Sequence, residues 1–588
     1  ERVKAGHWEG ELSTSALSTA TALVALGSVD EEVYAMEVKR ACTWLIDNQN
    51  EDGGWGDTTK SFSNISTTLL CWSALTRFGG APARKTCRRA SFWIHDYVGS
   101  LNPQLIAETV KARYGKDRTF SVPILMLCAI CGTLGTKGWK LVLRLPFELA
   151  AFPREWFAAM RLPVVSYALP ALIAIGYARN QKGVFRRFPH PIWPKVSKLL
   201  EEIQPASGGF LEAAPLTSFV TMALVSAGER DHPVAKEGVK FLLDTVREDG
   251  SWPIDTNLAT WSTTLSVKAL AAGKATGLGS GPNPVESSTQ QGQVADSTLF
   301  DSAEWVLEWL MGQQYREVHP FTNSAPGGWA WTDLSGGVPD ADDTPGALLA
   351  LRHLVGNRDF PEVKEAVEKA TIWLLDLQNR DGGIPTFCRG WGALPFDRSS
   401  EDLTAHTLRA WHVWQDVLSP EVLARAKKAK KKALHYLAKK QRSDGSWSPL
   451  WFGNQHRFSD EENPTYGTAL VTRALDEIGE SRLADRGASW LLSEQNSDGG
   501  WGAGKDTTPS SIEETALAVI GLAGRPGSDD SVRAGIDWLV RKTENGTRFE
   551  ATPIGFYFAR LWYFERTYPI IWTVEALGRA SAALSADP

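Results

Sequence analysis

The feature that most constrains the fold is a short motif that returns along most of the chain. Its form is Trp-Leu-x3-Gln-x3-Gly-x-Trp, and the first clear copy runs from Trp44 to Trp55. Complete, partial or degenerate copies begin at Phe241, Trp309, Trp373, Tyr436, Trp490 and Trp538. Such self-similarity indicates one supersecondary unit that stacks on its neighbours and buries a shared core.

Each repeat predicts a pair of helices. A periodic apolar segment ends at the glutamine, an Asp-Gly turn stops the helix, and Ser/Thr-rich segments such as Ser66-Thr67-Thr68 start the next one. We expect the glutamine to bond neighbouring helix ends and the tryptophan to stack beside it. Because no strand pattern competes, the sequence predicts an all-α fold of two α/α barrel domains that enclose a central apolar cavity.

Length and composition set the limits of this interpretation. The chain has 588 residues, which exceeds one ordinary domain. We place the boundary near Asp255, with an N-terminal barrel over 1–255 and a C-terminal barrel over 256–588. The net charge of −6 provides no basic surface for nucleic acid.

Cysteines and hydropathy exclude two further classes. The six cysteines form no regular disulfide framework, and the Cys128-x-x-Cys131 pair is expected to be buried thiol rather than half of a zinc site. The chain has no run of ~20 apolar residues such as a membrane span requires. Any contact with a membrane is therefore expected from one side only.

Three carboxylates gather in one short stretch, at Asp340, Asp342 and Asp343. Thr344 is expected to cap a helix whose first residue is Pro345, which places the acids at the positive end of that helix. Like charges this close do not all ionise cheaply, so at least one carboxyl should keep its proton near neutral pH. A capped polar loop and a divalent cation site are the alternatives, although the segment alone supplies too few oxygen ligands for the second.

A second polar stretch follows one repeat later. It reads Ser-Glu-Asp-Leu-Thr-Ala-His, and His406 lies four residues after Asp402 on the same helical face. A lone histidine on a helix is more often a core residue than a catalyst. Further on, Trp451 and Tyr466 flank a loop that opens another helix.

Together, the repeats, the D-x-D-D-T stretch and the S-E-D-L-T-A-H stretch resemble the squalene–hopene cyclases, which are class II triterpene cyclases. The resemblance runs from His7-Trp8 to Ala576-Leu577-Gly578. It implies a protonation-initiated cyclisation of squalene, or of a similar linear polyprene, to a polycyclic triterpene such as hopene or hopanol. It implies neither a cofactor nor a metal.

By this resemblance, six residues form the acid machinery. Asp342 falls on the proton donor to a terminal alkene, and Asp340 and Asp343 fall on the carboxylates that flank it. His406 falls on the histidine that bonds to the donor and acidifies it. Asp402 falls on the acid that orients this histidine, and Tyr466 falls on the tyrosine that helps reprotonate the donor through water. An alkene is a weak base, so a dry and strongly acidic donor suits this chemistry, and a cationic His406 would help the developing carboxylate.

Aromatic residues complete the expected site. Aromatic faces stabilise carbocations without attacking them, which gives the 25 tryptophans a use beyond packing. By matched position, the expected substrate-binding residues are Trp261, Trp331, Trp451, Phe387, Trp562 and Phe556, although any of them can also be ordinary core.

Departures from the family pattern affect the expected product. Phe387 stands where relatives usually carry a tyrosine near the growing cation, and Ile384 replaces a repeat tryptophan. The segment 210–219 differs from the water-holding loop of the family. The number of rings and the terminating step therefore stay open.

Several alternatives remain at this stage. The intact carboxylate trio favours a plain alkene over an epoxide, but an oxidised, shorter, longer or partly cyclised isoprenoid is an alternative substrate. An (α/α) barrel carbohydrate enzyme would need an acid pair on separate elements, and a repeat scaffold leaves the acids unexplained. A protein prenyltransferase subunit would require an Asp/Cys/His zinc set, which we do not find.

The resemblance also implies partners and a location. The expected partners are a squalene-like isoprenoid and, from one side, a lipid surface, together with a possible second copy of the chain. The expected location is the cytoplasmic side of a bacterial membrane.

Overall fold

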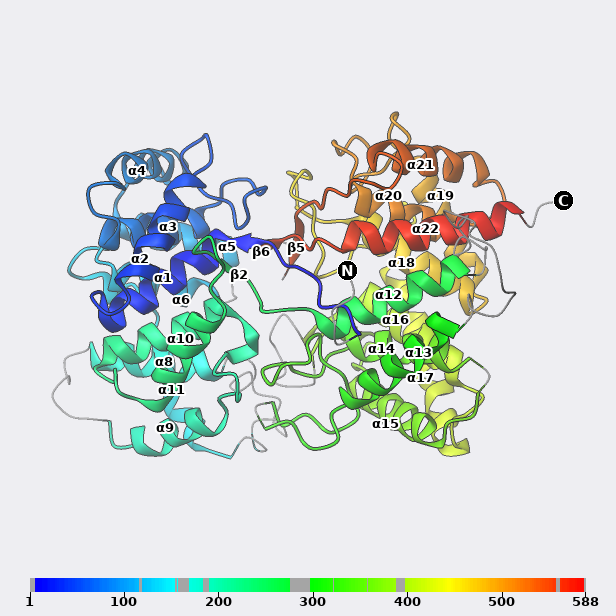
Figure 1. Cartoon of the computed structure of the whole chain (residues 1–588), viewed down its shortest axis with the longest axis horizontal. Helices are drawn as coiled ribbons and strands as arrows, with labels where there is room; N and C mark the ends of the chain where they lie inside the picture. The colour runs from blue at the N-terminus through cyan, green and yellow to red at the C-terminus, as the bar shows by residue number, and fades with distance from the viewer. Residues whose placement is uncertain are drawn as a thin grey trace, which may run out of the picture.

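The structure is a computed structural model of the chain. It describes residues 6–115, 119–153, 156, 169–182, 190–274, 297–320, 322–356, 358–387, 397–556 and 561–585. Most of these residues are helical, and the helices form two lobes that lie side by side in Figure 1, with the strands β5 and β6 between them. The predicted all-α fold class is confirmed.

The first lobe contains the helices from α1 to α11. Their bounds are α1 (Ala16–Asp30), α2 (Ala35–Asp47), α3 (Ile65–Phe78), α4 (Arg84–Val98), α5 (Pro103–Tyr114), α6 (Ser121–Ile130), α8 (Leu169–Gln181), α9 (Trp193–Glu202), α10 (Ala214–Ala227) and α11 (Pro233–Asp244). Contacts run from α3 to α1, from α1 to α10, from α10 to α8, and from α3 and α8 to α6. These five helices form the inner ring of the lobe.

The second lobe contains the helices from α12 to α22. Their bounds are α12 (Ala259–Lys274), α13 (Ser297–Gly312), α14 (Asp343–Val355), α15 (Pro361–Leu377), α16 (Glu401–Trp414), α17 (Pro420–Lys440), α18 (Pro464–Glu477), α19 (Ser481–Ser493), α20 (Ile512–Leu522), α21 (Asp529–Lys542) and α22 (Tyr568–Ser585). The even-numbered helices contact one another in order from α12 to α22, and α22 contacts α12 again. They form a closed inner ring, which we call the C-terminal ring.

Hydrogen bonds explain why the repeat folds as paired helices. Gln49 Nε2 donates to the carbonyls of Gly53 in its own turn and Thr86 in the next helix, at 2.7 and 3.0 Å. The same double contact is made by Gln204, Gln314, Gln378, Gln441 and Gln495. The predicted role of the glutamine is confirmed, and Gln204 belongs to a copy that the sequence analysis missed.

Local contacts also explain why tryptophan and glycine occupy their positions in the repeat. Trp55 Nε1 donates to the carbonyl of Leu45 at 2.9 Å, and the repeat tryptophans at 252, 329, 447 and 501 make the matching bond. We expected this residue to stack beside the glutamine; the contact that the structure gives is a hydrogen bond. Gly382 has a φ of +94°, and a Cβ there would lie 2.3 Å from the carbonyl oxygen of Lys432, so only glycine fits the turn.

Within the described ranges, six short strands, which the sequence did not predict, pair as three antiparallel ribbons. They are β1 (Thr14–Ser15) with β2 (Trp252–Pro253), β3 (Ile384–Pro385) with β4 (Ser399–Ser400), and β5 (Ile554–Phe556) with β6 (Leu561–Tyr563). Trp562 N in β6 donates to Asp57 Oδ2 of the first lobe at 2.8 Å. This bond links β6 to the first lobe.

The predicted boundary near Asp255 lies between β2, which contacts α1, and α12, which contacts α14 and α22. The N-terminal segment crosses to the second lobe, where Trp8 N donates to Thr263 Oγ1 at 3.0 Å and His7 stacks on Trp309. The division at 255 stays a prediction. Among the described residues, every helix lacks the length or the apolar character needed to cross a bilayer.

The cysteine pair behaves as buried thiol. Cys128 and Cys131 are free and buried, and burial raises the pKa of the Cys128 thiol to about 11. Cys388 lies outside the described residues.

Candidate active site

The three clustered carboxylates lie where a repeat turn meets the start of α14. Asp340 N donates to the carbonyl of Trp329 at 3.0 Å, and Ala341 N donates to the carbonyl of Thr386 at 2.7 Å. These backbone bonds hold the acid segment between two neighbouring repeats. Its position is therefore set by the fold and not by a mobile loop.

The helix begins two residues before the predicted position. Asp342 is the N-cap of α14, and Asp340 Oδ1 accepts hydrogen bonds from the backbone N–H groups of Asp342 and Asp343, at 2.9 and 2.7 Å. The prediction that Thr344 is the N-cap was wrong, because Asp340 satisfies the free N–H groups that a cap would bind. Thr344 instead accepts a hydrogen bond from Trp329 N at 2.9 Å.

Burial gives all three carboxyls raised pKa values. Asp340 and Asp343 are each 3% exposed, whereas Asp342 is partly accessible to a small cavity. Burial, then the charges of Asp402 and Asp340, holds the pKa of Asp342 well above its ordinary value. Burial likewise raises the pKa of Asp340 to about 7. These directions agree with the prediction that at least one carboxyl keeps its proton near neutral pH.

The cavity that Asp342 faces lies inside the C-terminal ring. Its volume is about 40 Å³, and its wall is formed by five of the inner helices and by Asp342, the N-cap of the sixth. The lining residues are Trp261, Leu265, Lys268, Asp342, Asp402, His406, Arg409, Tyr466, Leu470, Arg473, Leu517, Trp572 and Glu575. The fold thus brings together four of the six predicted catalytic residues, and Asp340 and Asp343 lie beside Asp342 in the chain.

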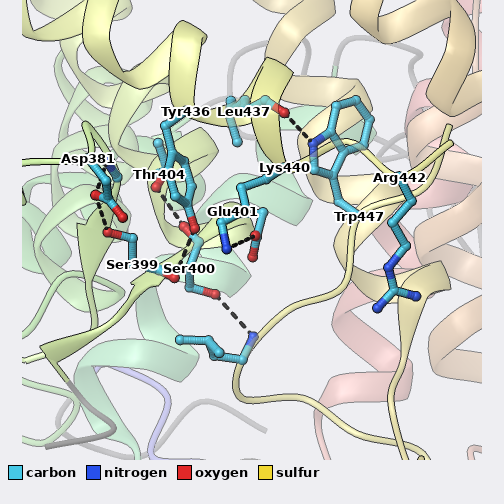
Figure 2. Close-up of polar contacts among 12 residues, drawn as sticks. Asp381, Ser399, Ser400, Glu401, Thr404, Tyr436, Leu437, Lys440, Arg442 and Trp447 are labelled. Carbon is cyan, nitrogen blue, oxygen red and sulfur yellow. Dashed lines mark hydrogen bonds and ion pairs between the residues drawn. The ribbon is translucent and has the colours of Figure 1, made fainter.

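The start of α16, which carries Asp402 and His406, is fixed by hydrogen bonds of Ser400 and Thr404, two residues that Figure 2 labels. Ser400 Oγ accepts from Leu450 N at 3.1 Å and donates to Asp402 Oδ1. Thr404 Oγ1 donates to the carbonyl of Ser400 at 2.6 Å and accepts from Ile384 N at 2.9 Å. These contacts hold the first turn of α16 and therefore the direction of both functional side chains.

His406 departs from one expectation. Burial and the nearby cations Lys268 and Arg409 hold its pKa well below the ordinary value, so the neutral imidazole is favoured and the cationic form expected from the sequence is not. A hydrogen bond to the backbone of Asp342 opposes this shift. Within the part of the chain that the structure describes, Asp402 and His406 share no hydrogen bond, and Asp402 bonds to Ser400 instead.

The expected aromatic residues fall into two groups. In the first, the Phe387 ring makes edge contacts with Trp331 and Trp451, at centroid distances of 6.1 and 5.6 Å. Phe387 also pairs with Asp340 through an isolated bridge, which places this group beside the acid segment.

The second group is Trp261, Trp562 and Phe556, of which Trp261 lines the cavity. Trp261 Nε1 donates to Tyr568 OH at 2.9 Å, and Tyr466 makes an edge contact with Trp572, with centroids 6.1 Å apart. Trp562 is buried in β6. The side chain of Phe556 lies outside the described part of the structure. Trp261 and Tyr466 both line the cavity.

Sequence analysis missed the charged residues of the cavity wall. They are Lys268, Arg409, Arg473 and Glu575, and all four are buried. Lys268 is an isolated charge on an otherwise apolar or hydroxyl-bearing helix face, in Leu265-Ser-Val-Lys268-Ala. That pattern is a signal that could have indicated this residue.

Similarity to known proteins agrees with this arrangement. The structure matches that of ent-copalyl diphosphate synthase from Streptomyces platensis with a TM-score of 0.57 and 20% identity, over 97% of this chain and 96% of that one. The fold is therefore that of a terpene cyclase.

Sequence comparison gives the family. The squalene–hopene cyclase C-terminal domain matches residues 285–582, and the N-terminal domain of the same family matches residues 1–187. The chain belongs to the squalene–hopene cyclase family.

The curated relatives differ in length from the chain. A terpene cyclase–glycosyl transferase fusion protein of Humicola fuscoatra is 26% identical over 94% of this chain and 46% of its own length. Enfumafungin synthase of Hormonema carpetanum is 22% identical over 95% of this chain and 45% of its own length. The chain spans about half the length of these two relatives. The squalene–hopene cyclase of Alicyclobacillus acidocaldarius is 24% identical, over 98% of this chain and 95% of that protein.

Proposed function

We propose that the protein is a class II cyclase that protonates a terminal alkene of squalene, or of a similar linear polyprene, and closes it to a polycyclic triterpene such as hopene or hopanol. Asp342 is the proton donor. The observation that carries the proposal is the position of this carboxyl, held protonated by burial at the edge of a closed helical ring.

The residues around Asp342 suit this step. The alkene π electrons take the Asp342 proton, which leaves a carboxylate and a tertiary carbocation. Asp340 holds the backbone of the donor through its two N–H contacts, and a dry site makes the carboxyl a stronger proton donor toward an apolar substrate. His406 and Tyr466 lie on the same cavity wall and are the polar neighbours of the donor.

The aromatic residues suit the steps that follow. Successive ring closures move the positive charge along the folded substrate, and aromatic faces stabilise it without forming a bond. We assign this role to Trp331, Phe387 and Trp451 beside the acid segment, and to Trp261, Trp562 and Phe556. Loss of a proton or capture of water ends the reaction. An isoprenoid of another length or oxidation state is the alternative substrate, since the same donor would start its cyclisation.

Membrane contact, a homodimer and a location on the cytoplasmic side of a bacterial membrane belong to the proposal as well. Their support is the family membership of the chain and the insolubility of a long polyprene in water. The predicted barrel domains 1–255 and 256–588 are part of it too.

Detergent-solubilised protein incubated with squalene tests the function, with products identified by mass spectrometry. We expect a cyclic isomer or its hydrate from the natural chain and none from Asp342→Asn, whose thermal unfolding should resemble that of the natural chain. Asp359→Asn, at an exposed carboxylate, is the matched control and should leave the rate unchanged. Product formed by Asp342→Asn at an unchanged rate would remove the proposed donor.

A further inference from the structure

Lys268 of α12 is a buried ammonium that opens on the cavity of the proton donor. It is 6% exposed, and its Nζ lies 5.7 Å from the centre of the Trp261 ring. Across the residues that the structure describes, neither a hydrogen bond nor an ion pair within 4.0 Å is formed by this Nζ. A buried charge without a partner is costly, and burial accordingly lowers the pKa of Lys268 to about 8. A residue that is costly to bury in this way invites a functional explanation.

Several charged and titratable groups line the same cavity as Lys268. They are Asp342 at the start of α14, Asp402, His406 and Arg409 on α16, Tyr466 and Arg473 on α18, and Glu575 on α22. Of these, Glu575 and Asp342 favour the charged form of Lys268, and Arg409 and Arg473 disfavour it. Two carboxyls of the cavity wall, on Asp342 and on Glu575, thus interact favourably with the ammonium.

The cavity has room for water between Lys268 and Asp342. Its volume of about 40 Å³ exceeds the roughly 10–15 Å³ that one water needs. The wall is polar enough to hold such a water, because Asp342, Lys268 and Tyr466 all face it. A bound water would join the ammonium to the carboxyl of the donor.

A series of ion pairs runs from Glu575 in the cavity wall to the protein surface. Glu575 pairs with Arg473 and, at 3.1 Å, with Arg579. Arg473 in turn pairs with Glu477 at 3.0 Å. The side chains of Arg579 and Glu477 are about 31% and 30% exposed. These ion pairs thus connect the cavity wall to side chains that solvent reaches.

We propose that Lys268 is the proton reservoir of the donor and returns a proton to Asp342 after each turnover, through water in this cavity. The proposal rests on the proposed function, because it needs Asp342 to give up a proton. When the alkene has taken that proton, an N–H bond of the ammonium breaks and an O–H bond forms on the Asp342 carboxylate. The neutral amine then takes a proton from solvent by way of the Glu575 side.

The neighbours of Asp342 make Lys268 the suitable reservoir. His406 is held neutral by burial and by the surrounding cations, so it has no extra proton to return. Burial holds the pKa of Tyr466 well above its ordinary value, so its hydroxyl can pass a proton but does not store one. Unlike these two groups, Lys268 has a charged form that is acidic enough to donate, and the Glu575 side can replace its proton from solvent.

Comparing one turnover with many tests the relay. With enzyme in excess over squalene, each molecule uses the proton it already holds, so refilling does not limit the rate. We expect the ratio of the steady-state rate to the single-turnover rate to fall at least tenfold in Lys268→Met and in Lys268→Arg, since neither side chain can donate. Lys364→Met, which removes an exposed lysine of α15, should leave this ratio unchanged.

The pH profile supplies a second readout, which is the shape of the rate curve and not its height. In the natural chain the steady-state rate should fall as pH rises through about 8, where Lys268 loses its charge. In folded Lys268→Met this limb should disappear.

The outcomes separate the two proposals. Unchanged rate ratios in both Lys268 variants, or an alkaline limb near pH 8 that persists in Lys268→Met, would overturn the relay. Product from Asp342→Asn at the natural single-turnover rate would instead overturn the proposed function, and the relay would fall with it.

Discussion

The two inner rings of this protein share one architecture but bury different chemistry. In the first lobe, the buried polar side chains of the described inner helices are hydroxyls alone, at Ser18, Thr19, Thr21, Ser66, Thr67, Thr68, Ser73, Ser121, Thr217, Ser218 and Thr221. In the C-terminal ring every inner helix buries at least one charged or acidic residue, among them Lys268, Asp343, Asp402, Arg473, Glu514 and Glu575. The same helical pairs thus enclose a hydroxyl-lined interior in one lobe and a charged interior in the other.

The difference indicates where function lies. A buried hydroxyl can donate a hydrogen bond to a helix carbonyl, so its burial costs little free energy. Burial of a charge costs much more free energy unless the charge is paired. Packing alone needs no charge, as the first ring demonstrates. We therefore expect the unpaired charge of Lys268 in the C-terminal ring to serve the proposed chemistry of Asp342, and the following changes test that comparison.

Removing a paired charge from the C-terminal ring should have the largest effect on stability. Arg473→Met removes one of the two arginines that Glu575 and Glu477 share, and leaves the other, Arg579. We expect the free energy of unfolding to fall by about 3 kcal/mol, because the buried Glu575 carboxylate loses its buried partner and keeps only the partly exposed Arg579. Denaturant unfolding measures the change. The double variant Arg473→Met/Glu575→Gln should recover part of the loss, and a double variant no better than the single one would contradict the pairing.

Removing His406 should affect the rate more than the stability. His406→Ala takes a polar group from the donor cavity, and we expect steady-state cyclisation to slow about 100-fold, as for loss of a group that assists proton transfer. Ser73→Ala, in the first ring, is the comparison and should leave the rate unchanged. If His406→Ala unfolds instead, the histidine is a core residue.

Replacing the unpaired lysine should stabilise the protein. Below pH 8 the folded chain carries a charged Lys268 whose pKa is lowered from 10.5 to about 8, and this costs ~3 kcal/mol at 1.36 kcal/mol per pKa unit. The stability of the natural chain should therefore rise as pH rises from 8 to 10.5 and be lower below that range. The free energy of unfolding of Lys268→Met should be about 2 kcal/mol higher than that of the natural chain at pH 7. The variant should also lose this pH dependence. A less stable Lys268→Met would mean that the ammonium has a partner that stabilises it.

A hydroxyl of the first ring should matter least. Thr221 is 1% exposed, and its Oγ1 has no hydrogen-bond partner among the described residues. Thr221→Val keeps the shape and removes an unsatisfied polar atom, so thermal unfolding should shift upward by the equivalent of ~1 kcal/mol or less. A large loss of stability would show that the first ring also depends on its polar interior.

The sequence predicted the repeat because its signals are local. The glutamine, the Asp-Gly turn and the helix that follows lie within a few residues of one another. Each copy can therefore be recognised from neighbouring residues alone. Two copies were incomplete for a physical reason. Trp329 closes the copy that opens at Gln314 after a longer loop, and the copy at Gln204 carries Phe210 in place of tryptophan.

The acid segment was predicted in part. The carboxylates and the helix after them were visible, but the cap was not, because Asp340 binds N–H groups that depend on the exact turn. The roles assigned to Asp342, Asp340, Asp343, His406, Asp402 and Tyr466 stay predictions until activity is measured.

The charged wall could not be predicted. Lys268, Arg473 and Glu575 come from helices more than a hundred residues apart, and only closure of the ring brings them to one cavity. The lowered pKa of His406 follows first from burial inside the ring and then from Lys268, Arg409 and Arg473. Both properties belong to the assembled ring.

Cyclisation in D2O tests the central claim most directly. If a carboxyl of the protein starts the reaction by protonating a plain alkene, the squalene product should carry one non-exchangeable deuterium, on the ring carbon derived from the =CH– carbon of the terminal alkene. Mass spectrometry and NMR locate that atom. A cyclic product without deuterium at this carbon would contradict protonation by Asp342 as the first step.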